Sequence, residues 1–135
     1  MLYYAQLFAN HMNSEGVKFS EEKENVIKVV YTGDNLDSIP VYVFFDKDGD
    51  PLVTFKCWNI INFKSNREAA INACNEMNAK FRWIKFYIDD DGDIIAEMDA
   101  MIDDATCGKE CLYLVRRAVS IIDDAYPTFV KARWA

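Results

Sequence analysis

The sequence predicts an α+β domain in which an antiparallel β-sheet carries its helices mainly on one face. Three observations lead to this prediction. Asp48-Gly49 and Asp91-Gly92 each separate two runs of alternating polarity, which is the pattern of a β-hairpin. Segments with helical period lie before, between and after the strands. No strand–helix–strand alternation indicates parallel pairing. The expected order is α-β-β-β-(β)-α-β-β-α, within a single domain covering residues 1–135.

The first part of the chain is predicted to be a helix followed by extended segments. Residues 2–13 repeat apolar side chains at helical spacing, and Gly16 is suited to end that helix. Residues 17–20 are expected to be extended, and residues 21–24 (EEKE) to form a charged turn. Residues 25–31 (NVIKVVY) are rich in β-branched residues, which favours a strand.

The first hairpin follows. Residues 39–45 (IPVYVFF) are the most apolar strand candidate, and Pro40 suits the beginning of a strand or a sheet edge. Residues 46–51 (DKDGDP) are expected to reverse the chain. The return strand, residues 52–59, alternates between two faces. Its even-numbered residues share one face: Leu52, Thr54, Lys56 and Trp58.

A second helix and hairpin come next. Residues 65–81 are predicted to be helical, because Ser65 and Glu68 match a capping box ahead of an apolar stripe. The stripe consists of Ala70, Cys74, Met77 and Phe81. Residues 82–88 change to period two, which predicts a strand. Its odd-numbered residues are expected on one face: Trp83, Lys85 and Tyr87. The return strand, residues 94–101, adds Ile95, Glu97 and Asp99 to the same face.

The last helix is predicted over about residues 106–126. Its apolar stripe consists of Cys111, Leu112, Val115, Ala118, Val119, Ile122 and Tyr126. The wetter side is expected to carry Arg116, Arg117, Asp123 and Asp124. Pro127 is expected to end the helix or to begin a short second turn, because proline lacks the backbone N–H that a helix interior needs. Residues 128–135 are then a tail, which Phe129 and Trp134 tie down in part.

Composition limits the function. The chain has 135 residues, of which 51% are hydrophobic and 27% charged, so it is expected to fold around a core. The net charge of −7 argues against binding of nucleic acid or of an anionic membrane surface. No apolar run approaches the ~20 residues that a membrane span needs. The four cysteines lie in apolar periodic segments, which is typical of reduced thiols in the cytoplasm.

No catalytic set, metal site or cofactor site is predicted. The loops 46–50 and 89–93 are rich in aspartate, but neither places glycine and glutamate where an EF-hand needs them. Cys107 and Cys111 share a helix face, yet two thiols supply only half of a zinc site. His11, the one histidine, lies on a different helix. No Gly-rich phosphate loop is present.

The sheet face opposite the helices is the predicted partner-binding surface. Aromatic and charged residues mix on it, as they do where rings anchor a partner inside a polar rim. The residues assigned to partner binding are Thr54, Lys56, Trp58, Trp83, Lys85, Tyr87 and Glu97, with Tyr42 and Phe44 as neighbours. Lys85 and Glu97 are expected to form a cross-strand ion pair. The alternative is an ordinary solvated face, partly covered by the C-terminal tail.

Two stretches carry a resemblance to a known family. NEMNAKFRWIKFYIDDDGDI and the earlier VYVFFDKDGDPLVTF resemble the bacterial YbjN family, over about residues 24–126. The resemblance implies a fold like that of the type III secretion chaperones, which are small, often dimeric α+β domains that bind other polypeptides. It also implies a regulator of sensory transduction, and it supplies no catalytic residues. Cys57, Cys107, Cys111 and the aromatic tail depart from the family pattern.

We therefore expect a non-enzymatic protein-binding domain, chaperone-like or regulatory, that forms a homodimer and acts on a protein partner the sequence does not identify. The alternative is a small-molecule or metal-binding sensor that uses the acidic hairpins or the pair Cys107 and Cys111. A third possibility is an enzyme, for which the sequence supplies no catalytic group.

Overall fold

In the computed structural model, residues 1–47 and 49–135 are described, and they contain one sheet of six antiparallel strands. The order across the sheet is β1-β2-β3-β4-β6-β5. The strands are β1 (Ser20–Lys23), β2 (Val26–Tyr31), β3 (Ile39–Phe45), β4 (Leu52–Cys57), β5 (Lys85–Ile88) and β6 (Ile94–Met101). The helices are α1 (Tyr3–Glu15), α2 (Arg67–Lys80) and α3 (Cys107–Trp134). The predicted α+β fold and element order are confirmed.

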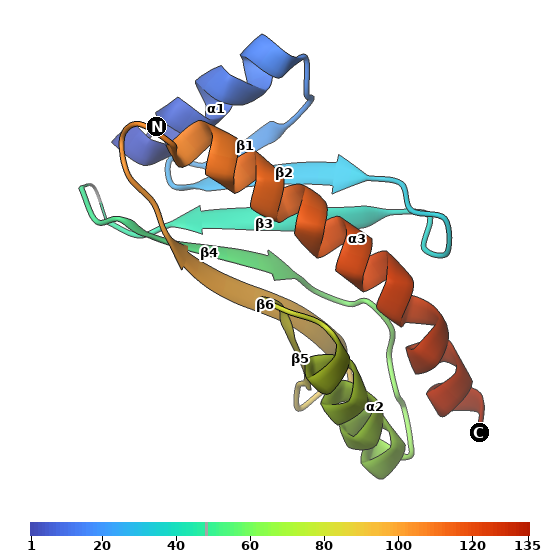
Figure 1. The fold of residues 1–135 in the computed structure, drawn as a ribbon. Helices are drawn as coiled ribbons and strands as arrows, with labels where there is room; N and C mark the ends of the chain where they lie inside the picture. Colours follow the sequence, from blue (N-terminus) through green and yellow to red (C-terminus); the bar gives the residue numbers. More distant parts are fainter. Residues whose placement is uncertain (48) are drawn as a thin grey trace.

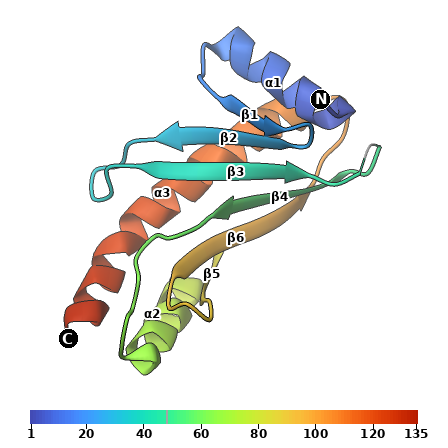
Figure 2. The same cartoon turned by 180° about the vertical axis from the view of Figure 1, so that it is seen from behind.

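The molecule has two layers. Helix α3 runs diagonally across one face of the sheet, with α1 near one end and α2 near the other (Figure 1). Figure 2 shows the other face, where no helix lies over β2, β3, β4 and β6. We call this the open face. Alternate side chains of the central strands point to the helices and form the core, including Val41, Val43 and Phe55, none of which is exposed.

Strand β1 begins at Ser20, the last residue of the predicted extended segment, and its other three residues were predicted to be part of a charged turn. Ser20–Lys23 pairs antiparallel with β2, and all four side chains are exposed. Such a strand has no apolar face, so hydrophobic alternation does not reveal it. Short, charged edge strands of this kind limit unwanted pairing with other chains.

Helix α2 begins differently from the prediction. The N-cap is Asn66, whose backbone is left-handed with φ of 61° and whose side-chain oxygen accepts a hydrogen bond from the backbone N–H of Ala69 at 3.3 Å. The capping box based on Ser65 is therefore wrong by one residue. Asparagine tolerates the left-handed region better than most residues, which explains why it occupies this position.

An α2 side chain also caps the outer edge of β5. The backbone N–H of Phe86 donates to Asn78 Oδ1 at 2.7 Å, and Asn78 Nδ2 donates to the Phe86 carbonyl at 3.0 Å. The amide of Asn78 thus takes the place that a neighbouring strand would occupy at Phe86.

Helix α3 continues through Pro127 to Trp134, so the predicted end at Pro127 is wrong. Proline inside a helix costs about 3 kcal/mol or more, because the carbonyl four residues earlier loses its donor. That carbonyl belongs to Asp123, and Asn35 Nδ2 donates to it at 3.2 Å. Phe129 is fully buried beyond the proline, which contributes about 1.5–3 kcal/mol. Together these two contributions offset the proline.

Asp123 is buried, although the sequence placed it on the wetter side of the helix. Its carboxylate accepts backbone hydrogen bonds from Asp34 at 3.0 Å, Asn35 at 2.8 Å and Leu36 at 3.0 Å. Gly33 lies against the same carboxylate, where a β-carbon would overlap it. Asp123 therefore fixes the β2–β3 loop to the middle of α3.

The Asp123 contacts predict a pH-dependent contribution to stability. Burial raises the pKa of this carboxyl, but the three N–H groups outweigh burial and leave the pKa below its usual value. A lowered folded-state pKa stabilises the protein above the unfolded pKa of about 3.9, and the contribution is lost as pH falls towards the folded value.

We expect Asp123→Asn to lower the free energy of unfolding by about 1–3 kcal/mol at neutral pH, because one of the three N–H groups then meets an amide N–H. The difference between variant and wild type should shrink below pH 4. Urea denaturation at several pH values measures both effects. Asp124→Asn, at the exposed neighbouring residue, is the control, and an equal loss in the control would contradict the assignment.

Candidate interaction surface

The strand register brings most of the predicted partner-binding residues onto the open face. Lys56 of β4 lies opposite Tyr42 of β3 on one side and Glu97 of β6 on the other. Lys85 of β5 is in turn opposite Glu97. Because directly paired residues of antiparallel strands point to the same side of a sheet, these side chains share one face. Thr54 and Tyr87 belong to the same face by the same pairing: Thr54 with Phe44, and Tyr87 with Ile95.

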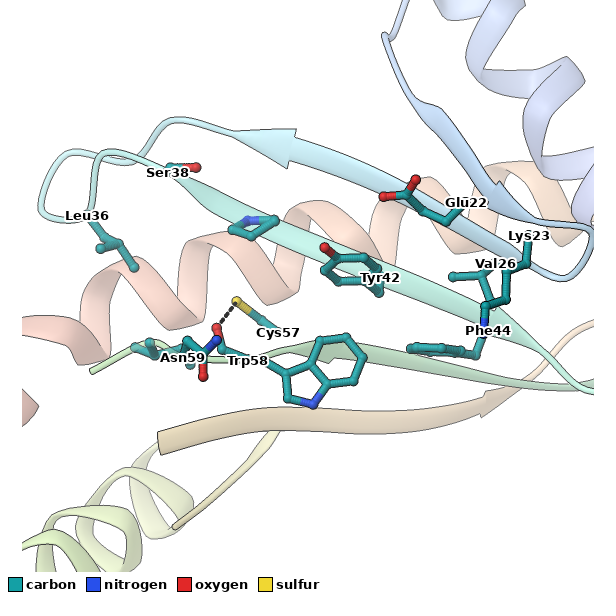
Figure 3. Close-up of a pocket in the computed structure, with 12 residues that line it drawn as sticks. Glu22, Lys23, Val26, Leu36, Ser38, Tyr42, Phe44, Cys57, Trp58 and Asn59 are labelled. Atoms are coloured by element: carbon teal, nitrogen blue, oxygen red, sulfur yellow. Dashed lines mark hydrogen bonds between the residues drawn. The ribbon is translucent and has the colours of Figure 1, made fainter. Parts of the chain in front are cut away.

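Three aromatic rings form a cluster on this face. The Trp58 ring makes edge contacts with Tyr42, at 5.0 Å between ring centroids, and with Phe44, at 5.7 Å. Tyr42 and Phe44 stack at 6.4 Å. All three side chains are half-buried, and Figure 3 shows them side by side above β3 and β4. We call them the aromatic cluster.

Lysine side chains border the aromatic cluster. Lys56 Nζ lies 4.8 Å from the centroid of the Trp58 ring and 3.5 Å from a carboxylate oxygen of Glu97. Lys28 Nζ lies 5.8 Å from the centroid of the Tyr42 ring and 3.3 Å from a carboxylate oxygen of Glu22. Each cation is thus held by a ring and a carboxylate together, which leaves the rings accessible and their rim polar.

Glu97 does not form the predicted ion pair with Lys85. Its carboxylate is taken by Lys56 and by the hydroxyl of Tyr87, which donates to it at 2.8 Å. The Lys85 ammonium instead lies 5.9 Å from the Tyr87 ring centroid. Burial, followed by the bond to Glu97, raises the pKa of Tyr87 to about 12.

A hollow of about 650 Å³ lies along the aromatic cluster. Leu36 and Ser38 of the β2–β3 loop line one end, and Glu22 and Lys23 of β1 line the other (Figure 3). The sequence did not predict these four residues as part of the surface. They come from segments without hydrophobic alternation. The one sequence signal near them was the β-propensity of residues 25–31, which predicted a strand between the two segments.

Trp83 does not lie on the open face, and this part of the prediction is wrong. Its ring contacts α3 on the other side of the sheet, with the Tyr113 ring centroid 6.4 Å away and Arg117 Cζ 5.4 Å from its own centroid. The cause is backbone geometry: Trp83 has a φ of 66°, and β5 begins only at Lys85. A left-handed residue interrupts the alternation that assigned Trp83 to the same face as Lys85.

The C-terminal residues leave the open face uncovered. They continue α3 on the helical side of the sheet, and Trp134 is 74% exposed. Of the predicted tail contacts, Phe129 is buried against Phe86. Exposed apolar residues add to the open face: Val30, Leu52 and Met101.

The other candidate sites do not assemble. The four cysteines are buried. Burial raises the pKa of Cys57 to about 12 and that of Cys74 to about 11, which disfavours the reactive thiolate at these two residues. The contact between Cys107 and Cys111 lowers the pKa of Cys107 and raises that of Cys111. The Asp89 carboxylate accepts bonds from the N–H groups of Asp91 and Asp93, so it stabilises the turn. In the described part of the chain, no three His, Cys, Asp or Glu side chains are placed to hold a metal ion. Asp48, in the other acidic loop, lies outside the described residues.

Comparison with solved structures identifies the class of fold. The chain is similar to a structure described as "YbjN, a putative transcription regulator from E. coli", with 11% identity, coverage of 93% of this chain and 92% of that chain, and a TM-score of 0.65. It is also similar to a chain of the heterodimeric ExoU-SpcU complex from the type III secretion system of Pseudomonas aeruginosa. That match has 11% identity, coverage of 91% and 94%, and a TM-score of 0.54. The fold is therefore that of the type III secretion chaperones.

The family follows from the sequence. Residues 5–131 match the model of the YbjN family, whose description is "Putative bacterial sensory transduction regulator". The chain belongs to the YbjN family. No curated protein sequence matches it. None of the helices in the described residues is both long and apolar enough to span a bilayer.

The hydrogen bond between Tyr87 and Glu97 predicts a loss of stability at high pH. Because the folded-state pKa is raised above the usual value near 10, the contribution of Tyr87 is present below pH 10 and is lost as pH rises towards 12. We expect Tyr87→Phe to lose less stability than the wild type between pH 9 and 11.5 in chemical denaturation. Tyr113→Phe, at an exposed tyrosine on α3, should behave like the wild type. Equal slopes for all three proteins would contradict the assignment.

Proposed function

We propose that this chain is a non-enzymatic protein-binding domain, chaperone-like or regulatory, that binds another polypeptide on the open face. The observation that carries the proposal is the aromatic cluster of Tyr42, Phe44 and Trp58. Lysines lie beside two of its rings, Tyr42 and Trp58, on a sheet face that no helix of the described residues covers.

The composition of the open face supports this proposal. Tryptophan and tyrosine are enriched at the centres of protein interfaces, where a polar rim surrounds them. Here the rings lie in the middle, and Glu22, Lys56 and Glu97 surround them. Leu52 and Met101, which are paired across β4 and β6 and are both exposed, add apolar area at one end of the open face.

The comparisons point in the same direction. The family is described as a regulator, and the P. aeruginosa chain belongs to a heterodimeric complex. The residues that we assign to partner contact on the open face are Tyr42, Phe44, Thr54, Lys56, Trp58, Lys85, Tyr87 and Glu97. A cytoplasmic location fits the four buried, unpaired cysteines, because reducing compartments keep thiols free.

The proposal predicts that Trp58→Ala and Phe44→Ala each weaken capture of a partner by about 30-fold or more, the effect of a hot spot of about 2 kcal/mol. Tagged wild type and variants would be used as bait in lysate of the source cell, and the captured protein would then be titrated in purified form. Trp134→Ala, at an exposed tryptophan on the helical layer, is the matched control.

Melting temperatures must first show that the variants fold. A partner that binds wild type, Trp58→Ala and Phe44→Ala equally would contradict the proposed face.

We also propose that the chain forms a homodimer. Light scattering of the purified protein is expected to give twice the monomer mass of 15.6 kDa. Hydrogen exchange at increasing concentration would show which face becomes protected. A mass that stays at one chain over the micromolar range would contradict the dimer and leave the proposal for the open face to its own test.

A small-molecule sensor is the second candidate, and the hollow beside the aromatic cluster is the observation that favours it. Its volume of about 650 Å³ lies within the range of about 300–1,000 Å³ that is usual for ligand sites. Quenching of Trp58 fluorescence by a small aromatic compound, lost in Trp58→Phe, would support this function. Its failure would leave the binding of a polypeptide as the use of this face.

A further inference from the structure

A second group of exposed rings lies on the helical side of the molecule. Trp83 is 52% exposed and Tyr113 is 54% exposed, and their rings make an edge contact. The guanidinium of Arg117 lies over the Trp83 ring, one helix position from Arg116. We call Trp83, Tyr113, Arg116 and Arg117 the α3 patch. It lies on the opposite side of the sheet from the aromatic cluster.

The backbone at Trp83 has a conformation that is rare for its residue type. A φ of 66° is rare for a residue with a bulky side chain, and such outliers persist where the surrounding structure or a function requires them. The backbone N–H of Ile84 donates to the Arg82 carbonyl at 2.7 Å, so Trp83 is the central residue of a tight turn that leads into β5. The turn buries Ile84 and leaves the Trp83 ring half exposed. This conformation turns the ring towards Tyr113 and Arg117 instead of burying it.

The charge of the patch differs from that of the molecule. Helix α3 carries five basic and three acidic residues, whereas the chain as a whole carries 15 and 22. One of the three acidic residues, Asp123, is buried and held by the β2–β3 loop. Among the ion pairs of the described residues, none involves Arg116 or Arg117. Within the described residues, Arg116 donates to the hydroxyl of Tyr31, at 3.2 Å.

A hollow of about 840 Å³ adjoins the patch between α1 and α3. Tyr113 and Arg116 belong to both the hollow and the patch, and Leu112 and His11 add to its wall. Charged residues of both signs also line the hollow: Glu15, Lys109 and Glu110. The hollow gives an apolar side chain space beside the rings. A carboxylate of the same ligand can reach the guanidinium of Arg116, which lines the hollow, and the guanidinium of Arg117 lies beyond it over the Trp83 ring.

We propose that the α3 patch binds an acidic polypeptide segment that carries an apolar anchor residue. Its carboxylates pair with Arg116 and Arg117, for which the fork of donors on arginine is well suited. Its apolar side chain packs on Trp83 and Tyr113. Duplex nucleic acid is a poorer match, since its binding depends on many phosphate contacts and the molecule as a whole repels phosphate at a net charge of −7.

A peptide-display selection tests this proposal. A library of random short peptides would be selected on immobilised wild type, and the recovered peptides would be sequenced and then titrated by fluorescence anisotropy. We expect enrichment of Asp and Glu together with Leu or aromatic residues. Arg117→Glu is expected to weaken binding by about tenfold or more, because it replaces attraction by repulsion.

Trp83→Asn is the second variant, because asparagine tolerates a positive φ and keeps the backbone while it removes the ring. Binding should again fall by about tenfold, a hot-spot loss. Lys131→Glu makes the same charge change near the end of the same helix, and Trp58→Ala changes the open face; both should bind as the wild type does. The Trp58→Ala result separates this proposal from the proposed function. Unchanged melting temperatures would show that the α3 variants remain folded.

Three outcomes would overturn the proposal. One is a selection without acidic enrichment or without binders above background. Another is acidic peptides that bind wild type, Arg117→Glu and Trp83→Asn alike. The third is a labelled DNA duplex that binds the wild type more tightly than the selected peptides and loses binding in Arg117→Glu, which would assign the patch to nucleic acid.

Discussion

The packing of α3 on one face of the sheet is the constraint on which the rest of the structure depends. Its buried residues meet the inward side chains of β3 and β4, and Phe129 near its end reaches Phe86 of β5. The middle of α3 is fixed to the β2–β3 loop, because the Asp123 carboxylate accepts hydrogen bonds from three backbone N–H groups of that loop. The same loop supplies Leu36 and Ser38 to the hollow on the open face. One helix therefore closes the core and positions a wall of the surface on the far side of the sheet.

The sequence predicted correctly the features that depend on a single segment of the chain, such as strand alternation and the end of a helix. The period of two in residues 52–59 assigned Thr54, Lys56 and Trp58 to a common face, because alternation follows directly from strand geometry. Gly16 ended the first helix as expected, with a φ of 69°. The features that the sequence did not predict depend on contacts between distant segments. Helix α3 passes Pro127 because Asn35, far away in the chain, supplies the missing donor.

The backbone angle φ of Trp83 decides on which side of the sheet its ring lies. Alternation assigned Trp58 and Trp83 to the same face. A positive φ at Trp83 places the two rings on opposite sides of the sheet. The molecule thus has an aromatic cluster bordered by paired charges on the open face, and a second group of rings beside two α3 arginines that form no ion pair with the described residues. The surroundings of the two clusters differ in charge, so they suit ligands of different chemistry.

The amide of Asn78 has a consequence for assembly. It fills the hydrogen-bonding position at Phe86 on the outer side of β5, so a further strand cannot join the sheet there without displacing it. The opposite border, β1, is four residues long, entirely exposed and irregular in its pairing with β2. A sheet with one blocked border can add a strand on one side only. Association through backbone pairing would therefore stop at two copies and would not propagate into a filament.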